Sequence, residues 1–282
     1  MDISQQVKYA QLDLLTELHR ICQKWSIPYF LIGGTLIGAI RHNGFIPWDD
    51  DIDVGMLRVD YERFCQACQE ELDPAYGLYD WDNDPCSPLP FRKLRIKGTH
   101  YQEPMSAGSG VNDGIFIDIF PYDNAPDSEF LRKLQAGQIY LVRKLLVLRC
   151  DFSIHNGSTV KKILYGMLKF LSRIRSVPAW KKTCRKLMLR YNDQPTRRIS
   201  NMCGAYSYRR EMMDRALVLE QVEHVFEGGM FNIPAGYDAF LRGVYGDYMQ
   251  LPPESQRVGK HGISMIDFGD YVIRWSRKGD TQ

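Results

Sequence analysis

The sequence predicts an α/β protein in which helices and short buried strands alternate, and three segments carry this prediction. Residues 5–25 repeat apolar side chains every three to four positions, as in an amphipathic helix. Residues 51–56 alternate polar and apolar side chains, which is the period of a strand. Residues 114–120 are an apolar run with a single carboxylate, which is typical of a buried strand. These segments indicate a mixed sheet covered by helices.

Further elements are expected around these three segments. Ser4 is expected to cap the first helix, residues 29–32 to form a short strand before a Gly-Gly pair, and Thr35 to cap the next helix. Pro121 is expected to end the strand that starts at residue 114. Later helices are expected at 59–72, 128–150 and 158–192, and a hairpin or two strands at 89–97 and 100–103.

The charge of the chain is unevenly distributed, although the formal net charge is only +2. Between Leu131 and Arg190 there are fifteen lysines or arginines and one acid, Asp151. The sequence texture therefore divides the chain into an α/β core over 1–127, a basic helical insertion over 128–204 and a mixed part over 205–282.

Cysteine usage and hydropathy bear on location. The seven cysteines are odd in number and scattered, which favours reduced thiols over a disulfide framework. The first residues have no basic segment followed by an apolar run, and no stretch of about 18 uncharged apolar residues occurs. We expect a cytoplasmic protein that is either soluble or bound peripherally at the inner face of the membrane.

Three aspartates form the chemical centre of the sequence. Asp51 and Asp53 project from the same side of the predicted strand, since residues i and i+2 share a face. Two neighbouring carboxylates repel unless a cation lies between them, and oxygen ligands with open positions suit Mg²⁺ or Mn²⁺. Asp118, inside an apolar strand, is the third carboxylate that such a site needs, because a buried charge must pair or bind metal. Three carboxylates on adjacent strands can hold two metals beside a phosphorus under attack.

Other interpretations of these aspartates are open. A calcium-binding loop counted from Asp49 needs Gly at position six and Glu at position twelve, where this chain has Val54 and Asp60. An acidic solvated turn conflicts with the apolar residues that alternate with the aspartates. Asp118 by itself is also compatible with a purely structural buried carboxylate, and its pairing with the upstream couple argues against that.

A glycine step and two cations complete the candidate site. Gly33, Gly34 and Thr35 lie between the predicted strand and helix, where backbone N–H groups can approach a phosphate. Arg41 and Lys93 are candidates for phosphate contacts, with plain surface charge as the alternative for each. If the ligand carries a quaternary ammonium, an aromatic cage is expected, for which these residues are eligible: Trp48, Tyr79, Trp81 and Tyr101.

Several motifs together resemble the LicD family. The longest is LIGGTLIGAIRHNGFIPWDDDIDVGM over residues 31–56, and the others are FRKL at 91–94, FIDIFPYD at 116–123, YGDYM at 245–249 and LPP at 251–253. The resemblance spans roughly 5–125 and 225–265 and leaves the basic helical segment as the divergent part.

The resemblance implies a polymerase-β-like nucleotidyltransferase core, with 205–282 completing the domain. In that superfamily a glycine-rich turn precedes a strand with Asp-x-Asp, and a later strand supplies a third aspartate. The matching positions here are Gly33 and Gly34, then Asp51 and Asp53, then Asp118. Members of the family transfer phosphocholine or a related phospho-alcohol from a CDP-linked donor to a cell-surface glycan precursor, and the fukutin proteins are eukaryotic relatives.

The resemblance and the residues together predict a metal-dependent phosphotransferase. Asp51, Asp53 and Asp118 are expected to be catalytic and to bind the metal, and CMP is the expected product. The expected acceptor is a hydroxyl group of a glycan, a lipid-linked glycan or a teichoic acid precursor. Two alternatives stay open, an NTP-dependent nucleotidyltransferase and a catalytically silent nucleotide-binding scaffold. The basic helices are either a solvated face or a membrane surface, and no nucleic-acid partner is expected.

Overall fold

The computed structural model describes residues 2–104, 109–150, 159–259, 262 and 264–276, with the backbone alone for 159–164. Its largest element is a mixed sheet. Within the described residues the sheet consists of β1 (Phe30–Leu31), β2 (Asp53–Leu57), β3 (Tyr76–Tyr79), β4 (Arg92–Ile96), β6 (Phe116–Ala125), β7 (Arg198–Asn201) and β8 (Met212–Asp214).

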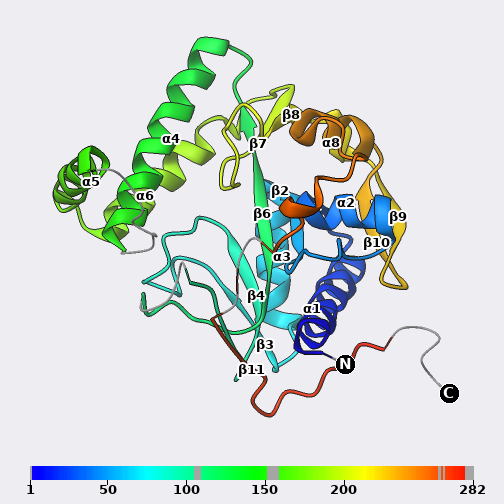
Figure 1. Ribbon diagram of the computed structural model, residues 1–282. Coiled ribbons are helices and arrows are strands. Elements are labelled where there is room, and N and C mark those ends of the chain that lie inside the picture. Colours follow the sequence, from blue (N-terminus) through cyan, green and yellow to red (C-terminus); the bar gives the residue numbers. More distant parts are fainter. Residues whose placement is uncertain (1, 105–108, 151–158, 260–261, 263, 277–282) are drawn as a thin grey trace.

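The strand order of this sheet is β1-β2-β6-β4-β3, with β7 and β8 extending it beside the second half of β6. β2 and β6 run parallel, and the other neighbouring pairs are antiparallel. β6 is the central strand and the longest, and it pairs with β4 through its first half and with β7 through its second half (Figure 1). The predicted α/β class with a mixed sheet is confirmed.

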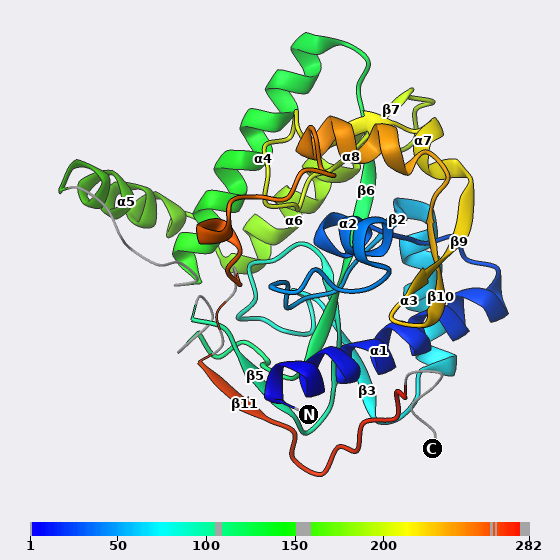
Figure 2. The same cartoon turned by 45° about the vertical axis from the view of Figure 1, so that its right-hand side comes forward.

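Helices cover the sheet and form two groups. The long helices are α1 (Ile3–Trp25), α2 (Gly33–His42), α3 (Arg58–Glu71), α4 (Glu129–Arg149), α5 (Thr159–Ser172), α6 (Val177–Met188) and α8 (Tyr237–Tyr245), with a short α7 at Ala216–Leu219. α4, α5 and α6 gather on one side of the molecule, and α1, α2 and α8 lie on the other (Figures 1 and 2). None of the helices in the described ranges is long and apolar enough to cross a membrane.

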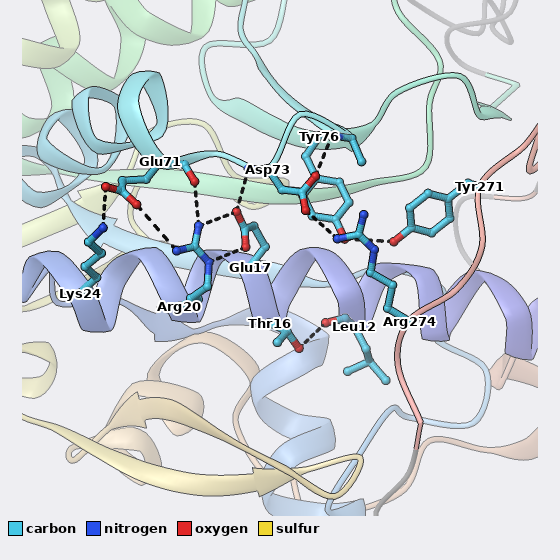
Figure 3. A network of polar contacts seen from close by, with 11 residues as sticks. Leu12, Thr16, Glu17, Arg20, Lys24, Glu71, Asp73, Tyr76, Tyr271 and Arg274 are labelled. Atoms are coloured by element: carbon cyan, nitrogen blue, oxygen red, sulfur yellow. Dashed lines mark hydrogen bonds and ion pairs between the residues drawn. The ribbon is translucent and has the colours of Figure 1, made fainter.

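Two smaller sheets close the structure. β9 (Gln221–Phe226) and β10 (Gly229–Pro234) form a hairpin, and β5 (His100–Gln102) pairs with β11 (Met265–Asp267) near the chain end. Single 3₁₀ turns lie at Leu189–Tyr191 and Glu254–Gln256. The segment after β11 returns along α1, where Arg274 bonds to Asp73 at 2.6 Å (Figure 3). The Tyr271 hydroxyl and the Arg274 N–H both donate to Oδ2 of Asp13, so residues 271–274 are attached to the first helix.

The expected elements are present with several corrections. The cap of α1 is Asp2, whose Oδ1 accepts from the Gln5 N–H at 2.8 Å, so the assignment of the cap to Ser4 is wrong. α2 begins at Gly33 without a side-chain cap, so Thr35 is not its cap. The segments at 89–97 and 100–103 contain β4 and β5, which pair with other strands rather than with each other.

Pro121 does not end β6, which continues to Ala125. The Asp118 N–H donates toward β2, to the carbonyl of Ile52, so at period two the position of Pro121 has no N–H to offer to the opposite edge. On that edge the pairing with β4 stops at Ile119 and the pairing with β7 starts at Tyr122. The proline therefore occupies the gap between two partner strands, where the sheet requires no donor.

In its described residues, the basic region folds as three α-helices rather than two. The expected run at 158–192 breaks after α5, and α6 starts behind the Ser176 cap with Pro178 in its first turn. The polar segment expected at 151–158 lies outside the described residues. β7 belongs to the central sheet although it falls within the predicted 128–204 insertion, and the three-part division of the chain stays a prediction. All seven cysteines are free thiols.

Candidate active site

The register of three strands aligns Asp53, Asp118 and Lys93. Asp53 on β2 pairs with Asp118 on β6 in the parallel ladder, and Lys93 on β4 pairs with Asp118 in the antiparallel ladder. Directly paired residues share a face of the sheet, so the three side chains form one row. Lys93 Nζ lies 2.7 Å from Asp118 Oδ1. The row combines two carboxylates with one ammonium group at the centre of the sheet.

The electrostatic setting of Asp118 is set first by burial. Burial raises the pKa of Asp118 above its ordinary value, and the charge and hydrogen bond of Lys93 oppose this shift. The negative charges of Glu103 and Asp51 raise the pKa of Asp118 further, so the carboxylates of Asp51 and Asp118 interact electrostatically. Asp118 is thus a carboxylate whose protonation depends on its neighbours, as expected for a group that exchanges a proton.

The two glycines at the start of α2 lie against the aspartates. Gly33 has φ +62°, and a Cβ at this position would lie 2.6 Å from Oδ2 of Asp53. A Cβ at Gly34 would overlap the carboxylate of Asp49. Only glycine permits this approach, and it brings the first N–H groups of α2, which have no acceptor within the helix, next to the carboxylates.

Asp51 lies in the loop before β2 rather than on the strand, which begins at Asp53. Its carboxylate gathers with those of Asp49 and Asp50, and one oxygen of each lies within 4.8 Å of the others. In the part of the chain that the structure describes, this is the one acidic trio gathered so closely. The structure therefore groups Asp51 with the two aspartates that precede it, and it aligns Asp53 with Asp118.

The residues present fit a divalent metal ion of the magnesium class. One carboxylate oxygen each of Asp49, Asp50 and Asp51 lies within 4.8 Å of the others, and Asp53 and Asp118 add two carboxylates on the neighbouring strands. No nitrogen or sulfur ligand takes part in the trio, so the donor set favours Mg²⁺ or Mn²⁺ over zinc.

Thr35 and Arg41, the other predicted substrate contacts, have different partners in the structure. The Thr35 hydroxyl is buried and accepts from the Asp53 N–H at 2.9 Å, so it holds the start of β2. Arg41 Nη1 donates to the carbonyl of Tyr248 at 2.8 Å. Burial lowers the pKa of Arg41, and the nearby charge of Arg257 lowers it further. The two guanidinium groups are therefore neighbours at the end of α2.

The four aromatic residues eligible for a cage have other contacts. The Arg257 guanidinium lies 5.6 Å from the centre of the Trp48 ring. Trp81 is buried, and Tyr101 packs edge-on against Phe116 with ring centres 5.5 Å apart. Tyr79 lines a small cavity with Lys93.

Two distant side chains hold the segment from Phe45 to Asp50, and no local sequence pattern indicates either contact. Gln11 on α1 donates to the carbonyl of Asp50 at 3.0 Å and to that of Phe116 at 3.3 Å. Glu227, in the β9–β10 turn, accepts from the Phe45 N–H at 3.1 Å. Both contacts join residues far apart in the chain, so only the folded structure reveals them.

A mixed sheet with a glycine-started helix set against aspartates of neighbouring strands defines a nucleotidyltransferase-type α/β protein. A family model described as the nucleotidyltransferase domain of LicD, FKTN and FKRP matches residues 26–134. The lipopolysaccharide cholinephosphotransferase LicD of Haemophilus influenzae is 30% identical over 260 residues, which cover 89% of this chain and 92% of that protein. The human and mouse ribitol 5-phosphate transferases FKRP are each 49% identical over 35 residues, which are 12% of this chain and 7% of theirs.

The chain belongs to the LicD family, as its motifs indicated, and it is a transferase of phosphorus-containing groups. The matched segment contains every candidate site residue, from Gly33 to Asp118. Most of the basic region, including α5 and α6, lies outside that segment.

Proposed function

We propose that the protein transfers phosphocholine, or a related phospho-alcohol, from a CDP-linked donor to a hydroxyl group of a cell-surface glycan or teichoic acid precursor. The row of Asp53, Asp118 and Lys93 beside Gly33 carries this proposal, because it places an anion-binding backbone next to carboxylates that can hold a metal. The names of two relatives, the cholinephosphotransferase LicD and the ribitol 5-phosphate transferase FKRP, support a phospho-alcohol as the transferred group.

The substrate diphosphate binds at the start of α2 in this proposal. The N–H groups of residues 33–35 and the ammonium of Lys93 donate to phosphate oxygens. Arg41, at the far end of the helix, is a further contact. Asp51, Asp53 and Asp118 hold Mg²⁺ or Mn²⁺, with Asp49 and Asp50 as supporting ligands. When bound, the metal neutralises charge on the phosphate oxygens during transfer.

The reaction forms one bond and breaks one bond. The acceptor oxygen attacks the phosphorus that carries the alcohol, and the bond from this phosphorus to the bridging oxygen breaks. CMP leaves with the bridging oxygen, and the acceptor proton passes to Asp118. Lys93 then lies next to Asp118 in both protonation states and fixes its orientation.

The setting of the reaction is part of the proposal. We place the protein in the cytoplasm, in peripheral contact with the inner face of the membrane, where a lipid-linked glycan acceptor is presented. CDP-linked donor and glycan acceptor are its partners, and nucleic acid is not among them.

One assay separates the proposal from its alternatives. The purified protein is incubated with CDP-choline, other CDP-alcohols or NTPs, with Mg²⁺ or EDTA, and the released product is identified. We expect CMP in the presence of Mg²⁺ or Mn²⁺, loss of turnover with EDTA, and a loss of at least roughly 10²-fold in Asp51→Asn. The exposed Asp193→Asn variant is the control and retains full activity.

Other products contradict the proposal. Pyrophosphate released from an NTP identifies a nucleotidyltransferase, and binding without turnover identifies a nucleotide-binding scaffold. Turnover by Asp51→Asn equal to that of the unchanged protein removes the metal role of the aspartates.

A further inference from the structure

One face of α5 exposes a stripe of large apolar side chains to solvent. Met167, Phe170, Leu171 and Ile174 have exposed fractions of 60%, 70%, 44% and 72%. Their spacing of three, four and seven residues places them on one side of a helix. Ile174 lies two residues after the end of α5. Its N–H donates to the carbonyl of Leu171 at 3.2 Å, so the helical turn continues to this position.

The orientation of α5 is held by contacts on its opposite face. The Trp180 Nε1–H donates to the carbonyl of Ser172 at 2.9 Å, and Ser172 itself is fully buried. On α4, the Lys144 ammonium lies 4.5 Å from the centre of the Tyr165 ring. Turning the apolar stripe inward would break both contacts. These contacts hold the apolar face of α5 toward solvent, whereas an ordinary surface helix turns its apolar face toward the core.

The surroundings of the stripe are strongly basic. Residues 159–192 contain ten lysines and arginines and no aspartate or glutamate. Arg173 and Arg175 are exposed next to the stripe, and Lys169 is half-buried among them. On α6, Lys182 and Lys186 are exposed as well, and Arg185 forms an ion pair with Asp82. An apolar stripe with exposed cations beside it in the sequence is complementary to a surface that is apolar inside and anionic outside.

We propose that α5 lies in the interface of an anionic lipid bilayer, with the stripe among the acyl chains and the neighbouring cations at the lipid phosphates. α5 lies at the outer edge of the molecule in both views, so a flat surface can reach it (Figures 1 and 2). An acidic protein groove is the rival occupant. The cations favour the bilayer, because they extend beyond α5 onto α6, where a groove around a single helix would not meet them.

This inference deepens the proposed function and, for its role in the reaction, rests on it, since a lipid-linked acceptor is presented at such a surface. The binding itself is independent of turnover. It can therefore be measured on the full chain without donor, acceptor or metal.

Flotation with lipid vesicles tests the inference. We expect the full chain to float with vesicles that contain phosphatidylglycerol and to stay behind with pure phosphatidylcholine, and we expect added salt to weaken the binding. In Phe170→Glu/Ile174→Glu, the partition onto anionic vesicles should fall by at least about tenfold, since two apolar anchors are replaced by repelled charges.

The control makes the same change of charge elsewhere. Val59 and Leu219 are exposed by 70% and 59% and lie on α3 and α7, and Val59→Glu/Leu219→Glu should partition almost as the unchanged protein does. Thermal unfolding of both double variants confirms that each is folded. As a second variant that leaves the stripe intact, Arg173→Gln should weaken binding to anionic vesicles by a smaller factor.

Two results overturn the inference: no flotation of the unchanged protein with anionic vesicles, or equal flotation of both double variants. CMP release is measured in parallel, with a CDP-alcohol as donor and a soluble acceptor. Turnover without vesicle binding removes the membrane inference alone, and vesicle binding without turnover removes the proposed function alone.

Discussion

Lys93 Nζ lies 2.7 Å from Oδ1 of Asp118, across the β4–β6 ladder that pairs the same two residues. The ion pair is almost enclosed, because the exposed fraction of each side chain is close to one tenth. A buried carboxylate that loses its cation partner becomes harder to ionise. The strand register therefore sets the proton affinity of the group that we assign as the base.

The first prediction concerns Lys93→Met. This variant removes the charge that lowers the pKa of Asp118, so the pKa rises further above its ordinary value. A base must be ionised to accept a proton, and the acid limb of kcat/KM should therefore move to higher pH. We also expect a loss of roughly 10²-fold at the optimum, because a phosphate contact disappears.

The control for this prediction is Lys97→Met, because Lys97 is exposed and bonds to the Pro74 carbonyl at 2.9 Å, outside the row. Its pH profile should match that of the unchanged protein. An acid limb that stays in place in Lys93→Met would show that Asp118 is not the titrating base.

The second prediction compares two glycines with positive φ. Gly33 and Gly98 have φ of +62° and +75°, and alanine at either position should cost about 1–2 kcal/mol in backbone strain. A Cβ at Gly98 has no neighbour within 4 Å, whereas one at Gly33 meets the Asp53 carboxylate. Both variants should lose similar stability in chemical denaturation, and only Gly33→Ala should lose at least about tenfold in kcat/KM. Equal activities of the two variants would remove the site role of the α2 start.

The third prediction concerns the buried amide of Gln11, which we assign as a positioning residue. Gln11→Leu leaves the carbonyls of Asp50 and Phe116 without their donor and should cost about 1–3 kcal/mol in the free energy of unfolding. Because the aspartate loop loses an anchor, the Mg²⁺ concentration at half-maximal activity should also rise by about tenfold.

The matched change for Gln11 is Gln23→Leu, at an exposed position of the same helix. It should leave both the stability and the metal response unchanged. A purely structural role of Gln11 would lower the stability without altering the metal response.

The residues of the candidate site could be picked out from the sequence because their determinants are local. Strand period placed Asp53 on one face, the apolar run around Asp118 required a partner for its charge, and the Gly33-Gly34 step marked a helix start. Each of these features needs only a few neighbouring residues to be recognised. The row that Asp53, Asp118 and Lys93 form depends on how β2, β6 and β4 pair. The resemblance to the LicD family implied that the aspartates lie on neighbouring strands before the structure showed it.

The remaining features depend on contacts between distant segments. The continuation of β6 through Pro121 requires the gap between β4 and β7, and β7 comes from a part of the chain that was assigned to helices. Thr35 carries the side chain of a helix cap, but its hydroxyl bonds to the Asp53 N–H, 18 residues away. The solvent-facing side of α5 depends on Trp180, since periodicity locates an apolar stripe without showing which way it points.

The fourth prediction concerns Asp13, which anchors the returning chain end to α1. Its Oδ2 accepts from the Tyr271 hydroxyl at 2.7 Å and from the Arg274 N–H at 2.8 Å, beside the Arg274–Asp73 contact (Figure 3). Burial raises the pKa of Asp13 above its ordinary value, and these hydrogen bonds only partly oppose the shift. Between the unfolded and folded pKa values, the folded protein holds more protons than the unfolded chain, so this group makes stability fall as pH rises through that window.

Asp13→Asn cannot titrate and should lack this contribution. Chemical denaturation of both proteins from about pH 4 to about pH 7 gives the difference in the free energy of unfolding at each pH, so that the other carboxylates cancel. We expect the stability of the unchanged protein to fall relative to Asp13→Asn as the pH rises. The matched change Asp193→Asn, at an exposed position, is the control. A difference that is constant with pH would mean that the hydrogen bonds from Tyr271 and Arg274 balance the burial of the charge, and one that grows in favour of the unchanged protein would mean that they outweigh it.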